Sequence, residues 1–199
     1  DLVTKIYKYS SNEIPAKVQY LLKMLGDFKH KKEKVIIWSN FLGTIEYIGK
    51  ILCEKGFEYK TIIGETPVEN DVNNENPSHV NLETREKIRL EFLDPKSGTN
   101  ILIANPAACS ESISLHQSCN NAIYYDLSYN CAQFIQSMDR IHRVGGSENQ
   151  DSYYYFLQYQ DTLDERIYQN LALKKQKMEA VSEIEYPVYN SDLFEEDDD

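Results

Sequence analysis

The sequence predicts an α/β fold, in which a parallel sheet carries helices on both faces and forms three layers. Short apolar runs rich in β-branched residues alternate along the chain with segments of helical character. The first of these runs is continuous rather than alternating, which is typical of a strand that is buried on both faces. Because strand and helix alternate with mostly short connections, the strands are expected to lie parallel to one another.

Five apolar runs predict the strands of this sheet. Each is short and rich in β-branched or aromatic residues, and most of them end at a glycine, an asparagine or a serine. The runs are "VIIWS" (35–39), "YKTIIG" (59–64), "NILIAN" (100–105), "AIYYDLS" (122–128) and "SYYYFL" (152–157).

Five further segments predict helices, the first from apolar residues at helical spacing and the third from its amphipathic pattern. Gly56 is expected to end the second helix, and Thr162 with Glu165 forms a capping box that opens the last one. The basic stretch 29–34 is expected to be a solvated turn, and residues 65–81 a long polar loop. The helical segments are 14–25, 43–56, 82–93, 131–143 and 161–181.

The charge of the chain is unevenly distributed. The 199 residues carry a net charge of −11, but residues 183–199 contain eight acidic residues and neither Lys nor Arg. Residues 1–182 therefore have a net charge of only −3. A domain so close to neutral is compatible with a local basic groove, and the acidic tail at 183–199 is expected to be disordered.

The cysteines and the apolar runs limit the classes of protein. The four cysteines form no CxxC pair and no spacing typical of zinc sites, so we expect reduced thiols and no metal centre. This usage indicates a cytoplasmic protein, or a nuclear one in a eukaryote. No apolar run is long enough to span a membrane, and no membrane partner is expected. The chain begins at Asp1 without Met, so a fragment of a longer protein is expected.

Polar and small residues follow the predicted strands. Ser39, Gly64, Asn105 and Asp126 come at the carboxyl ends of the first four. In open parallel sheets, ligands bind outside the carboxyl ends of the strands. We therefore expect these residues along one edge of the sheet, where a binding site would lie.

The segment "QSMDRIHRVG" (136–145) suggests phosphate chemistry. On a helix, Gln136, Asp139, Arg140 and Arg143 share one face, opposite the apolar face. Guanidinium groups are planar, permanently charged and able to bond two phosphate oxygens, so they suit a transferring phosphoryl group. Asp139 is placed to hold Arg140. The alternative is an exposed cluster of charges, which composition alone favours.

The same segment closely resembles the last conserved motif of superfamily-two helicases, in the Q-x-x-D-R-x-H-R-x-G form of the Snf-type DNA translocases. Other segments resemble further parts of this family in the same order, over about residues 14–180. A constellation of motifs in the expected structural context is more specific than any one of them. These segments are "AKVQYLLKML", "KVIIWSNFLGTIEYIGKIL", "YKTIIGET", "REKIRLEF", "ILIANPAACSESISLHQSCNNAIYYDLSYN" and "DSYYYFLQYQDTLDERI".

The resemblance implies the second of two RecA-like lobes, with ATP bound between the lobes. Arg143 would be the arginine finger on the γ-phosphate and Arg140 a second phosphate contact. Gln136, with Asp139 beside it, would contact the nucleotide or the other lobe. Ser112 and Ser114 would face the nucleotide from the fifth motif.

The resemblance also implies a track for duplex DNA. Ser39 and Asn40 of the fourth motif and Asn105 of the fifth would contact the nucleic-acid backbone, together with Gly64. The fifth motif departs from the family: residues 109–115 read Cys-Ser-Glu-Ser-Ile-Ser-Leu where Snf-type chains have Gly-Gly-x-Gly-x-Asn-Leu. Glycines permit positive φ and close approach of the backbone, so their loss marks a divergent subfamily.

The sequence has no GxxxxGK[ST] loop to hold phosphates and no Asp-Glu-x-His to hold magnesium. ATP and Mg²⁺ are therefore expected to bind mainly to an N-terminal RecA-like lobe of the same parent chain, and this chain alone is expected to be inactive.

The expected divisions of the chain are a lead-in (1–13), the RecA-like lobe (14–160), a brace-like helix (161–182) and the acidic tail (183–199). Two alternative functions remain open. One is an RNA helicase lobe, although RNA helicases generally carry Gly before the first Arg of the last motif. The other is a degenerate RecA-like module used for binding or as a scaffold.

Overall fold

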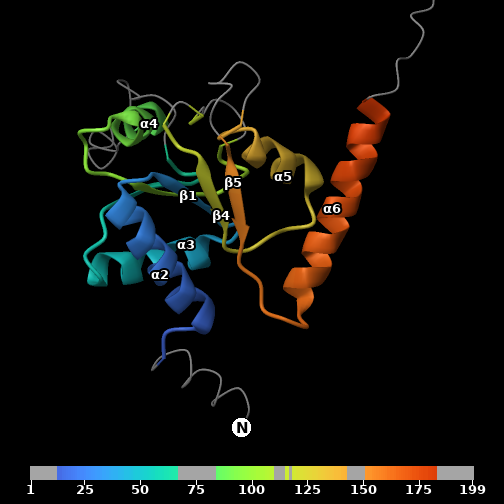
Figure 1. Cartoon of the computed structure of the whole chain (residues 1–199), viewed down its shortest axis with the longest axis horizontal. Coiled ribbons are helices and arrows are strands. Elements are labelled where there is room, and N and C mark those ends of the chain that lie inside the picture. Colours follow the sequence, from blue (N-terminus) through green and yellow to red (C-terminus); the bar gives the residue numbers. More distant parts are fainter. Residues whose placement is uncertain (1–12, 67–83, 110–114, 117, 143–150, 183–199) are drawn as a thin grey trace, which may run out of the picture.

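The structure is a computed structural model, and it describes residues 13–66, 84–109, 115–116, 118–142 and 151–182. Five parallel strands form one sheet in the order β2-β3-β1-β4-β5. Strands β1, β4 and β5 are labelled in Figure 1. The expected strands and their parallel pairing are confirmed, and their carboxyl ends come one to four residues before the ends of the apolar runs. The strands are β1 (Val35–Trp38), β2 (Tyr59–Ile62), β3 (Ile101–Ala104), β4 (Asn121–Tyr124) and β5 (Tyr153–Phe156).

The central strand β1 explains the three layers. All four of its side chains are buried, because neighbouring residues point to opposite faces and both faces are covered. Ile36 and Trp38 belong to one hydrophobic core, and Val35 and Ile37 belong to the other.

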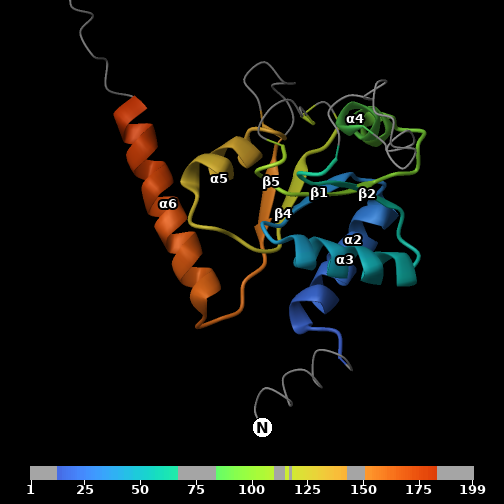
Figure 2. The ribbon, with the colours of Figure 1, turned by 180° about the vertical axis from the view of Figure 1, so that it is seen from behind.

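Helices cover both faces of the sheet, so the expected three-layer α/β fold is confirmed (Figures 1 and 2). On the Trp38 face, α4 (Arg85–Leu93), α5 (Cys131–Met138) and α6 (Leu163–Ser182) contribute buried side chains. On the Ile37 face lie α2 (Ala16–Lys31) and α3 (Leu42–Glu54). The long helix α6 runs beside α5 at the outside of the molecule. No helix among the described residues is long and apolar enough to cross a membrane.

The helix starts follow local capping chemistry. Asn130 caps α5 by accepting a hydrogen bond from Gln133 N (3.2 Å), and Thr84 caps α4 in the same way. At α6, Thr162 Oγ1 accepts from Asp164 N (3.3 Å) rather than from the N–H of Glu165, which the expected capping box would use. Glu165 reaches back to the N–H of Asp161 rather than to that of Thr162 (3.1 Å). These caps fix where α4, α5 and α6 begin.

The prediction of a solvated turn at residues 29–34 is wrong. Helix α2 continues to Lys31 and ends at Lys32, which has a φ of 59°. Lys34 is buried, and its ammonium group donates to Phe92 O and to Asp94 O (3.0 Å). The carbonyl groups at the end of α4 lack partners within the helix, so a cation there satisfies them and opposes the negative end of the helix dipole.

The helix expected over residues 131–143 is shorter than predicted, because α5 ends at Met138. Arg140 N bonds Ser137 O and Ile141 N bonds Met138 O (both 3.3 Å), which tightens the chain into a turn that brings Ile141 into the core. Tyr154 OH also donates to Met138 O (3.0 Å). Consequently Gln136 stands on the helix, whereas Asp139 and Arg140 belong to the turn that follows it.

Candidate functional site

The carboxyl ends of β1 and β4 meet at a point where the chain diverges. These two strands are neighbours in the sheet. The chain leaves β1 for α3 on one face, and it leaves β4 for α5 on the other face. Such a divergence between neighbouring parallel strands opens a crevice in which α/β proteins bind ligands.

Asp126 connects the two loops at this point. Its carboxylate accepts hydrogen bonds from Ser39 Oγ (2.5 Å), from Asn40 N (2.7 Å) and from Asn40 Nδ2 (3.2 Å). Asn40 Nδ2 also donates to the Asp126 carbonyl oxygen (3.3 Å). One carboxylate from the β4 loop therefore holds both the backbone and the side chain of the β1 loop.

Asn105, which directly follows β3, joins the same group. Its Nδ2 donates to Asn40 O (3.0 Å), and its Oδ1 accepts from Ala107 N (2.9 Å). We call Ser39, Asn40, Asn105 and Asp126 the carboxyl-edge cluster. The structure thus brings together three of the predicted nucleic-acid residues. Ser39 is fully buried, whereas the other three members are only partly buried.

The predicted residue Gly64 lies on the adjacent loop and is fixed by Arg85. The Arg85 guanidinium donates to Gly64 O (3.2 Å), to Thr66 O (2.9 Å) and to Ala108 O (2.7 Å). Arg85 thereby ties the loop after β2 to the segment after β3. A Cβ atom at Gly64 would have no heavy atom within 4 Å, so packing does not require glycine there.

The end of α5 carries the predicted nucleotide contacts that the structure describes. Gln136 and Asp139 are exposed, and Arg140 is partly buried. Arg140 O accepts from Leu115 N (2.9 Å), which joins this turn to the segment that follows β3. Burial raises the pKa of the Cys109 thiol to about 12, and the positive charges of Arg85 and Arg140 oppose that rise. Both guanidinium groups therefore act on the same segment.

Buried hydroxyl groups tie α5 to the sheet beneath it. Tyr124 OH and Ser137 Oγ lie 2.8 Å apart, and Ser137 Oγ donates to Phe134 O (2.7 Å). Burial raises the pKa of Tyr124 above its ordinary range, and the hydrogen bond with Ser137 opposes this. Burial likewise raises the pKa of Tyr154 to about 12. These phenols stay neutral at physiological pH and serve as fixed donors.

Three predicted site residues lie outside the described residues: Arg143, Ser112 and Ser114. The lead-in at 1–12 and the acidic tail at 183–199 also lie outside them. Among the residues that are described, no three His, Cys, Asp or Glu side chains form a group that could hold a metal ion.

Sequence reasoning missed two connections in the site. The sequence shows Arg85 only as part of a segment that resembles the family, and its bonds to three carbonyl groups depend on loops that are distant along the chain. The sequence predicts Asp126 at the edge of the sheet but indicates no role for it. The signal available for Asp126 is an acidic residue immediately after a buried strand, beside a serine that follows another.

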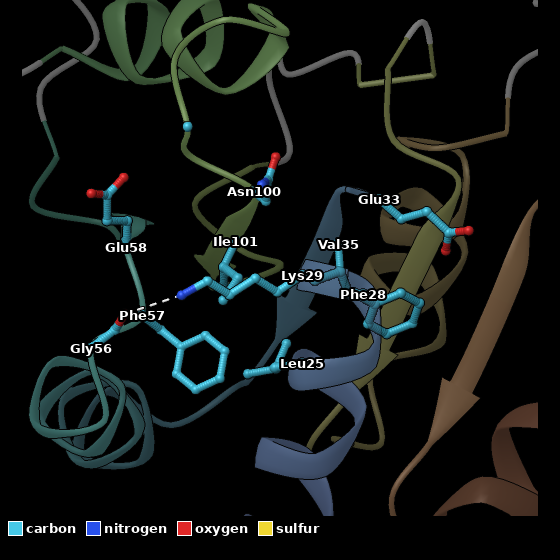
Figure 3. Close-up of a pocket in the computed structure, with 11 residues that line it drawn as sticks. Leu25, Phe28, Lys29, Glu33, Val35, Gly56, Phe57, Glu58, Asn100 and Ile101 are labelled. Carbon is cyan, nitrogen blue, oxygen red and sulfur yellow. Dashed lines mark hydrogen bonds between the residues drawn. The ribbon is translucent and has the colours of Figure 1, made fainter. Parts of the chain in front are cut away.

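A cavity of about 210 Å³ lies at the opposite, amino edge of the sheet (Figure 3). Leu25, Val35 and Ile101 are among its apolar lining, and Lys29 reaches across it to donate to Gly56 O (3.4 Å). None of the predicted site residues that the structure describes lines this cavity. The cavity therefore lies at the amino edge of the sheet, whereas the carboxyl-edge cluster lies at the opposite edge.

Comparison with known proteins identifies the family. A family model described as the helicase conserved C-terminal domain matches residues 16–145. The chain belongs to this family. Its relatives place it in the Snf-type branch of superfamily two, so the resemblance found in the sequence is confirmed.

This helicase C-terminal lobe is similar to several larger proteins. It is 27% identical over 165 residues to the ATP-dependent DNA helicase DDM1 of Arabidopsis thaliana, covering 83% of this chain and 19% of that protein. It is 26% identical over 161 residues to the human DNA repair and recombination protein RAD54B, covering 80% of this chain and 16% of that protein. The chain thus spans less than a fifth of the length of these relatives.

A solved structure supports the RecA-like fold of this lobe. The crystal structure of the C-terminal part of the Fun30 ATPase domain superposes with a TM-score of 0.64 at 26% sequence identity. The match covers 78% of this chain and 44% of that one.

Proposed function

We propose that this helicase lobe is the second motor lobe of an ATP-dependent DNA translocase or helicase. In this proposal it supplies the arginine finger and part of the nucleic-acid track. The observation that carries the proposal is the carboxyl-edge cluster, which gathers residues of the fourth and fifth motifs at one crevice. Relatives named as an ATP-dependent DNA helicase and a DNA repair and recombination protein support DNA as the partner.

The nucleic-acid track consists of Ser39, Asn40, Gly64 and Asn105. Asn105 provides a side-chain N–H for a phosphate oxygen, and polar groups that contact the backbone bind without regard to sequence. Ser39 and Asn40 contribute by holding the shape of the loop, since their side-chain donors already bond Asp126. Gly64 lets a sugar-phosphate backbone approach closely, a role supported by the open space beside it.

The nucleotide side consists of Arg143 and Arg140 as phosphate contacts, with Gln136, Asp139, Ser112 and Ser114 around them. The described part of this set fits one side of a nucleotide, because Gln136 is exposed and the Arg140 turn is fixed against the segment after β3. Bound ATP with Mg²⁺ supplies the reactive phosphate and neutralises its charge. A guanidinium group delivered by this lobe stabilises the charge that develops during transfer.

The remaining parts of the motor lie in other regions of the parent chain. An N-terminal RecA-like lobe binds most of the ATP and Mg²⁺, so the lobe alone is inactive. Residues 14–160 form the motor lobe, 161–182 a brace-like helix, 1–13 a lead-in and 183–199 an acidic tail. ATP binding closes the two lobes and hydrolysis opens them, which steps the pair along duplex DNA in the cytoplasm or the nucleus.

A second candidate function is a degenerate RecA-like module that binds or scaffolds without hydrolysis. The observation that favours it is the fifth motif, in which residues 109–115 contain no glycine. The last motif disfavours an RNA helicase lobe, because Asp139 stands before Arg140 where RNA helicases generally carry Gly.

The test is the ATPase rate of the complete parent protein, with and without duplex DNA, beside its Arg143→Ala variant. We expect duplex DNA to stimulate the wild type and the substitution to reduce the stimulated rate by about 10³-fold, the effect of removing an arginine finger. Arg89→Ala is the matched control, because Arg89 pairs with Glu86 at the surface (2.7 Å) and that variant should keep the wild-type rate.

Three other outcomes would change the assignment. A wild type that hydrolyses no ATP with any nucleic acid would favour the scaffold module. Stimulation by duplex RNA in preference to DNA would favour the RNA helicase. An Arg143→Ala variant with wild-type activity would remove the arginine finger from this lobe.

A further inference from the structure

We propose that Asp126 is a positioning residue that sets the hydrogen-bonding pattern of the nucleic-acid track and leaves Asn105 as its side-chain donor. This inference rests on the proposed function and deepens it. Asp126 itself does not contact the nucleic acid. It acts through Ser39 and Asn40, which are 87 and 86 residues away along the chain.

The first step is the orientation of Asn40. An ionised carboxylate accepts hydrogen bonds and cannot donate them. With Asp126 Oδ1 3.2 Å from Asn40 Nδ2 and 2.7 Å from Asn40 N, the NH₂ end of the Asn40 amide must face the carboxylate. A flipped amide would place its oxygen against the same negative charge, so the carboxylate selects one of the two orientations.

The second step is a count of donors in the carboxyl-edge cluster. The single hydroxyl proton of Ser39 goes to Asp126 (2.5 Å) rather than to the more distant Phe41 O (3.4 Å). The Asn40 NH₂ group bonds the carboxylate and the carbonyl oxygen of Asp126. Asn105 Nδ2 has two N–H groups and makes one bond within the described residues, to Asn40 O. A phosphate oxygen, which only accepts, is therefore recognised by the second N–H of Asn105.

The third step is the position of Asn105. Its amide is held at both ends, because Nδ2 bonds Asn40 O and Oδ1 accepts from Ala107 N. Asn40 O is in turn held by the bonds that Asp126 makes to the Asn40 backbone and side chain. Loss of the carboxylate would release the β1 loop, and the remaining donor of Asn105 would lose its fixed direction.

The fourth step is topological. The chain leaves β1 for α3 on one face of the sheet and leaves β4 for α5 on the other face. Side-chain bonds therefore link the two loops at the point where they separate. Asp126 is part-buried and makes four bonds across this point, counting its carbonyl oxygen.

The experiment measures the ATPase rate of the complete parent protein against the concentration of duplex DNA. We expect Asp126→Ala to raise the DNA concentration for half-maximal stimulation by about tenfold, the usual effect of losing hydrogen bonds to a charged group. The KM for ATP should change by less than about twofold, because nucleotide contacts lie elsewhere; a general loss of structure would move both quantities.

Two further variants sharpen the result. Asp126→Asn should shift the half-maximal DNA concentration by only about threefold, because an amide can accept from Asn40 N and donate to Ser39 Oγ. Asn105→Ala should match or exceed the shift of Asp126→Ala, since it removes the direct donor. Asp27→Ala is the matched control: Asp27 is exposed on α2 and should leave every quantity unchanged.

The outcomes separate this inference from the proposed function. If DNA stimulates the wild type and Asp126→Ala has the same half-maximal DNA concentration, the inference is wrong and the proposed function stands. If DNA does not stimulate the wild type, both fail. If Asp126→Ala does not unfold cooperatively, Ser39→Ala decides: a shift of about twofold supports the inference, and an unchanged value for both Ser39→Ala and Asp126→Asn overturns it.

Discussion

Similar polar groups have different roles at the two edges of the sheet. At the carboxyl edge, Asp126 and Asn105 bond across three loops and are only partly buried. At the amino edge, Lys34 and Asn121 are 9% and 5% exposed. Lys34 satisfies carbonyl groups at the end of α4, and Asn121 Nδ2 donates to Lys34 O (3.2 Å).

This difference teaches that burial, rather than chemistry, distinguishes Lys34 and Asn121, which hold the fold, from Asp126 and Asn105 of the site; Ser39 is the buried member of the carboxyl-edge cluster. A buried polar group must find its partners inside the protein, because leaving it unsatisfied costs free energy. A partly buried group can keep a donor for a ligand. The comparison therefore predicts that changes at the amino edge act on stability, whereas changes to the carboxyl-edge cluster act mainly on DNA dependence.

The largest expected effect on stability is at Lys34. Lys34→Met should lower the free energy of unfolding by about 3 kcal/mol, because it leaves buried carbonyl groups without the ammonium donor. Chemical denaturation of the lobe measures this, with the exposed Lys31→Met as the control. The DNA dependence of the folded parent variant should remain that of the wild type. A loss below about 0.5 kcal/mol would mean that Lys34 does not hold the amino edge.

The second expected effect is a dependence of stability on pH, which arises from one buried thiol near each edge of the sheet. Burial raises the pKa of Cys119 from 9.0 to about 12 and that of Cys109 likewise. Above pH 9.0 the unfolded chain therefore loses these protons first, and the folded protein binds more protons than the unfolded one. The stability that the neutral thiols provide is complete below that pH and is lost as the pH rises towards about 12, by up to about 1.4 kcal/mol per pH unit for each thiol.

Denaturation at several pH values measures this loss of stability. Cys119→Ala should lose stability less steeply than the wild type above pH 9, by about 2 kcal/mol over two pH units. Cys53 is exposed, so Cys53→Ala should follow the wild type. Equal slopes for Cys119→Ala and the wild type would show that Cys119 is not protected from ionisation.

The smallest effect is at Arg85, on the carboxyl side. Arg85→Ala should lower the free energy of unfolding by about 1.5 kcal/mol, because three carbonyl groups of two loops lose their donor. Arg89→Ala on the same helix should cost less than about 0.5 kcal/mol, since its pair with Glu86 is at the surface. If the two variants were equally stable, the loops would be held by other contacts.

Much of the fold could be predicted from local patterns. The strands came from apolar runs, and the starts of α4, α5 and α6 follow from capping residues such as Thr84 and Asn130. The end of α5 could not be predicted. The helical pattern continues through Ile141, but the chain tightens into a turn after Met138. Tyr154 OH and Leu115 N, from distant segments, bond Met138 O and Arg140 O in this turn.

The site was predicted as a set of residues rather than as a geometry. Ser39, Asn40 and Asn105 could be assigned to one edge because each follows a parallel strand. That they bond one another could not be predicted, because it depends on which strands are neighbours. The strand order places β1 between β3 and β4, and this order brings Asn105 and Asp126 to opposite sides of the β1 loop.

The sequence by itself determined the α/β class, the parallel strands, the helices and the family, because periodicity, capping and motif spacing are properties of neighbouring residues. Tertiary structure alone decided the role of the polar groups. Lys34 became a buried cap in place of a solvated charge, and Asp126 became the link between two loops. The physical reason is that a hydrogen bond forms only where donor and acceptor meet, and these partners are 60 and 87 residues apart until the sheet assembles.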